Sequence, residues 1–111
     1  MTAAQIVTLQ IEAYNNRDIE GNMALFSENF KIINFLENSV LIDGKEAYRK
    51  MYAQLFDNSP NLFAEVISRI DFDNKVILHE YITGRNGSNE KTEHLFIFEV
   101  NHGKIEKIFR M

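Results

Sequence analysis

The sequence contains no cysteine, which removes disulfide bonds and thiol chemistry from any account of its fold or function. A chain without cysteine fits a reducing compartment, so we expect a cytoplasmic protein, although exported bacterial proteins can also lack cysteine. No apolar run approaches the roughly 18 residues that a membrane span needs, and the first residues lack a basic stretch followed by an apolar one. We therefore expect a soluble protein with no membrane partner.

Clusters of basic residues are also missing. The formal net charge is −4, and the lysines and arginines are scattered along the chain. A nucleic-acid-binding surface would concentrate positive charge against the phosphate backbone, so the composition argues against a nucleic-acid partner. The histidines, His79, His94 and His102, are too dispersed for a zinc-type spacing, and we expect no metal site. No phosphate-binding glycine pattern and no Ser-His-Asp or Cys-His arrangement is present.

What the chain does contain is apolar bulk. Of its 111 residues, 45% are hydrophobic and 12% aromatic, with nine phenylalanines. This length and composition predict one domain, residues 1–111, with a real core and bulky side chains that can border a cavity. No internal repeat, linker or low-complexity segment divides it.

Helical spacing of apolar residues predicts a first helix over residues 3–15 and a third from Asp43-Gly44 to about Asp57. Asp18 is a suitable N-cap for a short helix between them. The third helix has the clearest apolar stripe in the chain, made by Tyr48, Met51, Tyr52, Leu55 and Phe56.

Short runs rich in Val, Ile and Phe predict strands at residues 29–35, 40–42, 92–100 and 104–111, and a long β-hairpin within residues 61–87. The hairpin turns at Asp73-Asn74, two residue types that tolerate positive φ. This turn predicts that Arg69 pairs with Leu78, Ser68 with His79 and Ile67 with Glu80. The element order favours an α+β fold with the helices gathered on one side of a curved sheet.

That order, with several short segments, resembles the SnoaL-like branch of the nuclear transport factor 2-like superfamily. The segments are AYNNRD (13–18), DGKEAYRKMYAQLF (43–56), SPN (59–61), HEYITG (79–84) and EVNHGKI (99–105). The resemblance implies a cone-shaped α+β barrel, with three helices from the N-terminal half packed into a strongly curved antiparallel sheet and a pocket inside. It also implies a homodimer through the outer sheet face, which the predicted register assigns to Val66, Ile70, Ile77 and Tyr81.

The superfamily includes ketosteroid isomerase, polyketide cyclases, dehydratases, epoxide hydrolases and non-catalytic binding modules, so the fold does not decide the function. In the ketosteroid isomerase pattern the base aspartate aligns approximately with Asn34, which cannot accept a proton. The oxyanion-hole tyrosine aligns near Gln10, and its acid partner aligns near Phe96. These differences argue against literal ketosteroid isomerisation.

Glu80 is the strongest catalytic candidate from the residues themselves. Its neighbours on the same strand face are Leu78 and Ile82, so the carboxyl group should be partly desolvated and its pKa raised. Arg69 is expected as its diagonal neighbour, forming either an anion-orienting pair or a structural ion pair. His94 is the third candidate, as a proton donor or as a satisfied core histidine. His79 alternates to the opposite face, so His79 and Glu80 form no dyad.

The candidates for substrate binding are polar groups and aromatic wall residues of the expected cavity. Tyr14, Tyr52 and Asn34 could offer hydrogen bonds to a carbonyl or hydroxyl group, and Phe96 and Phe98 would form the wall.

Three functions remain open from the sequence. The first is a cofactor-independent isomerase, cyclase or hydrolase that uses acid–base chemistry on a small apolar, oxygenated molecule. The second is a protein that only binds such a ligand, and the third is a dimeric interaction module.

Overall fold

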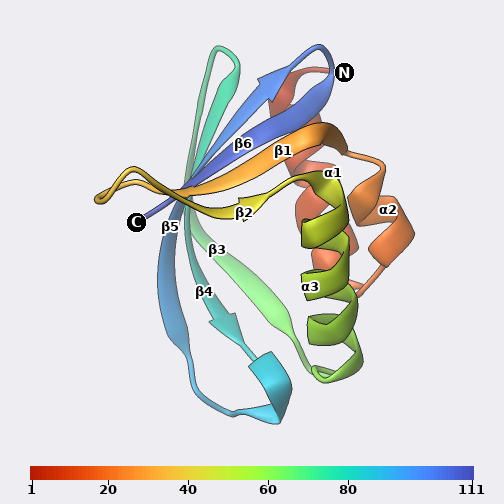
Figure 1. The fold of residues 1–111 in the computed structure, drawn as a ribbon. Helices are drawn as coiled ribbons and strands as arrows, with labels where there is room; N and C mark the ends of the chain where they lie inside the picture. The colour runs from red at the N-terminus through yellow and green to blue at the C-terminus, as the bar shows by residue number, and fades with distance from the viewer.

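The computed structural model describes all 111 residues and contains three α-helices, one short 3₁₀ helix and six strands (Figure 1). Their order is α1 (Ala3–Asn15), α2 (Ile19–Met23), β1 (Phe26–Asn34), β2 (Ser39–Asp43), α3 (Lys45–Asp57), β3 (Phe63–Phe72), β4 (Lys75–Thr83), η1 (Arg85–Gly87), β5 (Thr92–Asn101) and β6 (Lys104–Arg110).

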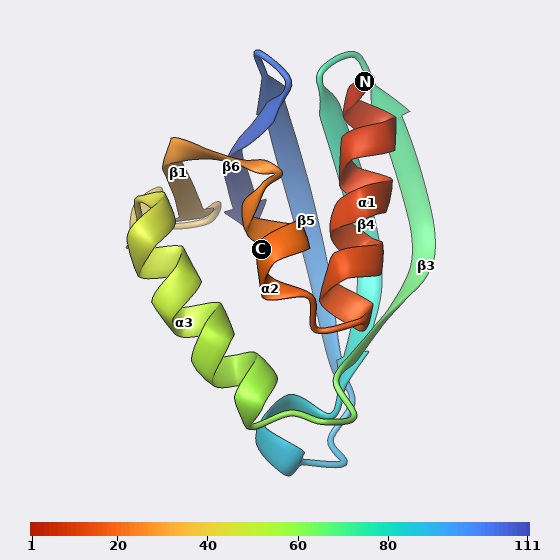
Figure 2. The ribbon, with the colours of Figure 1, turned by 90° about the vertical axis from the view of Figure 1, so that its right-hand side faces the viewer.

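The six strands form one sheet in the order β2-β1-β6-β5-β4-β3. The sheet is strongly curved, and the helices lie on its concave side (Figures 1 and 2). This arrangement confirms the predicted α+β cone with three helices packed into a curved sheet. One detail differs from the expected antiparallel sheet, because β1 and β6 pair in parallel.

Local signals set the helix ends. Thr2 and Gln5 form a capping box at the start of α1, and the Asp18 carboxylate accepts a hydrogen bond from the Gly21 N–H, which confirms Asp18 as the N-cap of α2. Gly44, at φ 95°, precedes α3 and allows the sharp change of direction from β2.

The β3–β4 hairpin has the predicted turn, with Asp73 at φ 55°. The pairs Arg69–Leu78 and Ser68–His79 are also confirmed. The pair Ile67–Glu80 is wrong, because the register shifts between Val66 and Ser68 and brings Val66 opposite Glu80. Such a bulge adds one residue to a strand and reverses the alternation beyond it, so Val66 does not share the outer face with Ile70.

The interior contains two clusters of buried apolar side chains. The larger one includes Phe26, Phe30 and Tyr48, whose rings lie 4.6–4.8 Å apart, together with Val76 and Leu78 of β4. The smaller one lies farther along β4 and consists of Tyr14, Phe56, Leu62, Ala64 and Ile82. β4 therefore crosses the whole interior.

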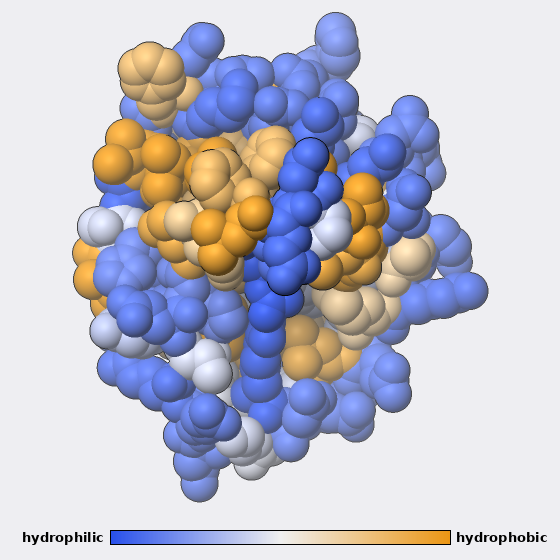
Figure 3. All heavy atoms as spheres, turned by 60° about the vertical axis from the view of Figure 1, so that its left-hand side comes forward, coloured by the Kyte–Doolittle hydropathy of each residue, from blue (hydrophilic) through white to orange (hydrophobic).

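The outer face of the sheet is apolar and uncovered. Figure 3 shows a broad hydrophobic area there, to which Ile70 and Phe72 contribute with 58% and 72% of their surface exposed. We call it the outer patch; it consists of Phe35, Ile70, Phe72, Ile77, Ile97 and Phe109. None of the helices has the length and apolar character that a membrane crossing requires.

Candidate functional site

A cavity of about 340 Å³ lies between α1, α3 and the concave face of the sheet. Hydrophobic side chains make up 14 of its 19 lining residues, including Phe96 and Phe98, which therefore lie where the sequence placed them. The polar and charged side chains that matter for chemistry are Gln10, Tyr14, Tyr52, Glu80, Arg85 and Arg110.

Glu80 lies on the concave face of β4, lines this cavity and is 6% exposed. Its inward neighbours on β4, Leu78 and Ile82, are both fully buried, and no hydrogen bond contributes to the pKa of its carboxyl group. Burial raises the pKa of Glu80 to about 7, and the positive charge of Arg85 opposes part of that rise. At neutral pH the group can therefore both take up and release a proton.

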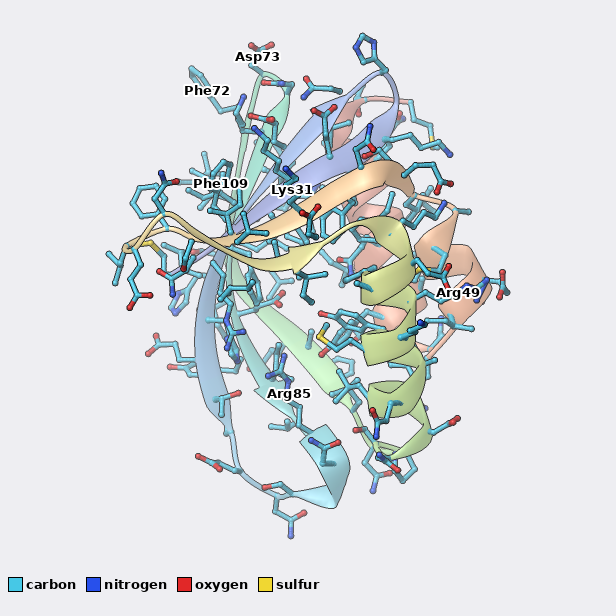
Figure 4. All side chains as sticks on the ribbon, in the orientation of Figure 1. Lys31, Arg49, Phe72, Asp73, Arg85 and Phe109 are labelled. Carbon is cyan, nitrogen blue, oxygen red and sulfur yellow. The ribbon has the colours of Figure 1, made fainter.

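Arg85 follows β4 at the start of η1, and the sequence analysis missed it. Gly84 before it has φ 83° and lies so close to the Asn61 carbonyl that a Cβ atom there would clash with the carbonyl oxygen. The next residue, Asn86, donates its backbone N–H to the Ser59 hydroxyl at 2.8 Å. These contacts fix η1 against the turn after α3, and the Arg85 side chain extends from η1 into the hollow (Figure 4).

The Nε atom of Arg85 is buried and has no hydrogen-bond partner within the protein. The hydroxyl of Tyr14, which is only 5% exposed, also makes no hydrogen bond of standard geometry, but Arg85 lies close enough to it to lower its pKa. Burial and the neighbouring Tyr52 raise the pKa of Tyr14, so its hydroxyl remains a hydrogen-bond donor at all ordinary pH values. Two buried donors thus border the same cavity as Glu80.

Tyr52 also lines the cavity, as predicted, and burial raises the pKa of its hydroxyl. Its ring centre lies 4.3 Å from that of Tyr48 and 5.8 Å from that of Tyr14. Tyr48 is fully buried, and its oxygen accepts a hydrogen bond of 3.2 Å from the Asn22 amide. Asn22 in turn accepts one of 3.3 Å from Gln10, so these three polar groups satisfy one another.

Arg69 does not reach Glu80, and the expected Arg69–Glu80 pair is wrong. Its guanidinium binds the Asp71 carboxylate at 2.9 Å, the Thr8 hydroxyl at 2.8 Å and the Ala4 carbonyl at 2.6 Å. Arg69 thus joins β3 to α1 and does not line the cavity. The pairing rule placed Arg69 on the correct face but could not show that α1 offers it nearer acceptors.

Asn34 is also not in the cavity lining. Its side-chain oxygen accepts the Glu37 N–H at 3.0 Å and so stabilises the turn between β1 and β2. The predicted role in substrate binding therefore has no geometric support.

His94 faces Glu80 across the β4–β5 pairing, but it is not among the lining residues. Its Nε2 lies 2.8 Å from the Thr92 hydroxyl, and its ring stacks on Phe96 with centres 5.4 Å apart. Burial, Arg85 and Arg110 together lower the pKa of His94 to about 4, so the ring is neutral at pH 7. His79 lies outside and contacts Glu93 at 2.6 Å, in agreement with the predicted alternation.

The comparisons with known proteins can be set beside this geometry. The SnoaL-like domain family matches residues 7–108. An uncharacterised cystatin-fold protein from Novosphingobium aromaticivorans superposes with a TM-score of 0.89 at 19% identity, over 100% of this chain and 98% of that one. A comparison with curated proteins gives no match.

Two further solved structures have proposed activities. A proposed ketosteroid isomerase from Kribbella flavida has a TM-score of 0.82 at 14% identity, over 97% of this chain and 75% of that one. A proposed polyketide cyclase from Sinorhizobium meliloti has a TM-score of 0.79 at 14% identity, over 100% of both chains. At these identities the likeness concerns the fold alone.

Proposed function

The chain belongs to the SnoaL-like domain family, and from that premise we propose that its cavity binds a small, mostly apolar, oxygenated molecule and transfers a proton on it without a cofactor. One observation carries the proposal. Glu80 is buried in an apolar cavity and its pKa is shifted only by burial and by the Arg85 charge, while the neighbouring Arg85 Nε and Tyr14 hydroxyl lie close to each other but make no hydrogen bond of standard geometry. Buried polar groups in folded proteins are almost always paired, so a group of unpaired ones around a cavity is typical of a site that receives a ligand.

The chemistry follows from these groups. The Tyr14 hydroxyl and the Arg85 guanidinium would donate hydrogen bonds to a carbonyl or enol oxygen of the ligand. Glu80, with a pKa of about 7, would remove a proton from the adjacent carbon and return it to another position. This is general acid–base catalysis of the kind that isomerases and cyclases use, in keeping with the proposed activities of two structural neighbours. His94 is neutral at pH 7, so it adds no positive charge to the site.

The proposal can be tested without knowing the natural substrate. The protein is incubated in D₂O with 1-tetralone or cyclohexanone, whose α protons exchange slowly, and deuterium uptake is followed by NMR. We expect exchange to be about 10²-fold or more faster than with Glu80→Gln, a typical contribution of a positioned general base. Arg69→Gln is the matched control, because Arg69 lies outside the cavity, and it should exchange at the wild-type rate.

Equal exchange by the wild type and Glu80→Gln would contradict proton transfer. If both bind the ketone equally well but neither promotes exchange, the protein only binds ligands.

We also propose that two copies of the chain associate through the outer patch. Its centre is exposed and apolar, as Ile70 shows, and its border carries both signs of charge in the Lys75–Glu99 pair. A second copy can therefore present a complementary border. Sedimentation analysis should give a dimer that Ile70→Asp disrupts and that Leu9→Asp, an exposed apolar position on α1, leaves intact. Monomeric wild-type protein at high micromolar concentration would contradict this proposal.

A further inference from the structure

The cavity contains two arginines whose charges no acidic group of the protein pairs. The structure has ion pairs from Arg49 and Arg69, but Arg85 and Arg110 take part in none. Arg85 is close enough to Glu80 to lower its pKa, yet the two groups are not within ion-pair distance. The cavity of an acidic protein therefore has an excess of positive charge.

The two guanidinium groups approach the cavity from different elements. Arg85 enters from η1, whereas Arg110 ends β6 opposite Phe96 in the strand pairing and is exposed, which places it at the cavity's edge. Both lower the pKa of His94, whose ring stacks on Phe96. The positive charges thus converge on one wall of the cavity, formed by β5.

Arg85 is half-buried and its Nε atom is fully buried, so this part of the guanidinium has lost hydration that no protein group replaces. Its planar arrangement of N–H donors matches the two oxygens of a carboxylate, and the Nε of Arg85 is a free, buried member of that set. The rest of the lining is apolar, and the volume of about 340 Å³ suits a molecule of one or two rings.

We propose that the ligand is a ring compound with one anionic oxygen group of the carboxylate type, held by Arg85 and Arg110 against the β5 wall. The inference rests on the proposed function only in using the same cavity, since it concerns which molecule enters and not what happens to it.

Charged and titratable groups face Glu80 from every element around it. They are Tyr14 from α1, Tyr52 from α3, Arg85 from η1, His94 from β5 and Arg110 from β6.

The test compares two probes of the same shape, 2-naphthylacetate and 2-naphthylacetamide, by ¹H–¹⁵N NMR titration of the whole protein. We expect the anion to bind the wild type at least about tenfold more tightly than the amide, as a charge-assisted pair with arginine requires. The shifted resonances should lie around η1 and β5. Equal affinities, or no binding of either probe at millimolar concentration, would overturn the proposal.

Variants show which arginines produce the preference for the anion over the amide. Arg85→Gln should abolish it, Arg110→Gln should weaken it, and Arg85→Lys, which keeps the charge but loses the planar donor set, should retain part of it. Arg49→Gln is the matched control, because Arg49 lies on the outer side of α3, where it pairs with Glu20 (Figure 4). If Arg85→Gln does not fold, Arg85→Lys and Arg110→Gln still decide the matter. A preference for the anion that survives in all three cavity variants would overturn the proposal.

The outcome is separable from that of the deuterium exchange experiment. An Arg85-dependent preference for the anion without Glu80-dependent exchange would leave a carboxylate-binding protein and refute catalysis. Glu80-dependent exchange without any preference for the anion would support catalysis and refute carboxylate binding.

Discussion

The interior has two regions that treat buried polar groups differently, although β4 runs through both. Around Asn22, the polar side chains of Gln10, Asn22 and Tyr48 bond to one another. Around Glu80, the Tyr14 hydroxyl and the Arg85 Nε make no hydrogen bond of standard geometry within the protein. Gln10 and Tyr48 line the same cavity as Glu80, so the difference separates a self-paired part of the cavity lining from a part that is left open to a ligand.

The largest expected effect tests the packed region. Leu78 is fully buried in the larger cluster, so Leu78→Ala should lower the free energy of unfolding by about 2–5 kcal/mol through lost burial and the cavity left behind. Ile82→Ala should cost less, about 2 kcal/mol, because Ile82 already borders the cavity. Urea denaturation measures both, and a larger loss for Ile82→Ala would reverse the distinction between the two regions.

Glu80→Gln should raise the free energy of unfolding, whereas the two alanine variants lower it. The folded pKa of Glu80, about 7, lies above its ordinary value of 4.5, so the folded state binds the extra proton and stability falls as pH rises through this window. Replacing the carboxyl group by a neutral amide removes this loss. Relative to the wild type, the variant should gain about 3 kcal/mol between pH 4 and pH 8, measured by urea denaturation at each pH. A variant less stable than the wild type at pH 8 would contradict the burial of an unpaired carboxylate.

Two Tyr→Phe variants, one in each region, form a matched pair, because each removes a single hydroxyl oxygen. Tyr48→Phe leaves the Asn22 amide without its acceptor and should cost about 1–3 kcal/mol. Tyr14→Phe removes a hydroxyl that has no protein partner, and its stability should stay within about 0.5 kcal/mol of the wild type. Thermal or urea unfolding distinguishes the two, and equal costs would mean that the Tyr14 hydroxyl is as well paired as that of Tyr48.

The smallest expected effect concerns His94. Its folded pKa of about 4 lies below 6.5, so it contributes stability that is present above pH 6.5 and lost as pH falls toward 4. Glu80 has the opposite and larger slope in nearly the same window, so in the wild type His94 should offset only part of the Glu80 effect. In His94→Gln, the free energy of unfolding should fall as pH rises through this window, because Glu80 still titrates there. In Glu80→Gln, it should rise with pH by on the order of 1 kcal/mol, because solvent screens the half-buried His94 ring. Slopes of the same sign in the two variants would refute this.

Much of the fold could be predicted because its signals are local. Apolar spacing and the Asp18 cap defined the helices, and Asp73-Asn74 defined the hairpin turn with the register up to Ser68. Alternation put Glu80 and His79 on opposite faces, because successive side chains of a strand point to opposite sides. The structure shows that Glu80 is on the inside and His79 on the outside.

Only the tertiary structure decided what surrounds Glu80. The bulge after Val66, the capture of Arg69 by α1 and the entry of Arg85 from η1 all depend on contacts between segments far apart in the chain. By itself the sequence determined that Glu80 would share a strand face with Leu78 and Ile82, and that His79 would lie on the other face, since successive side chains of a strand alternate. It could not determine which cation would accompany that group, because long arginine side chains bind whichever acceptors the folded chain brings within reach.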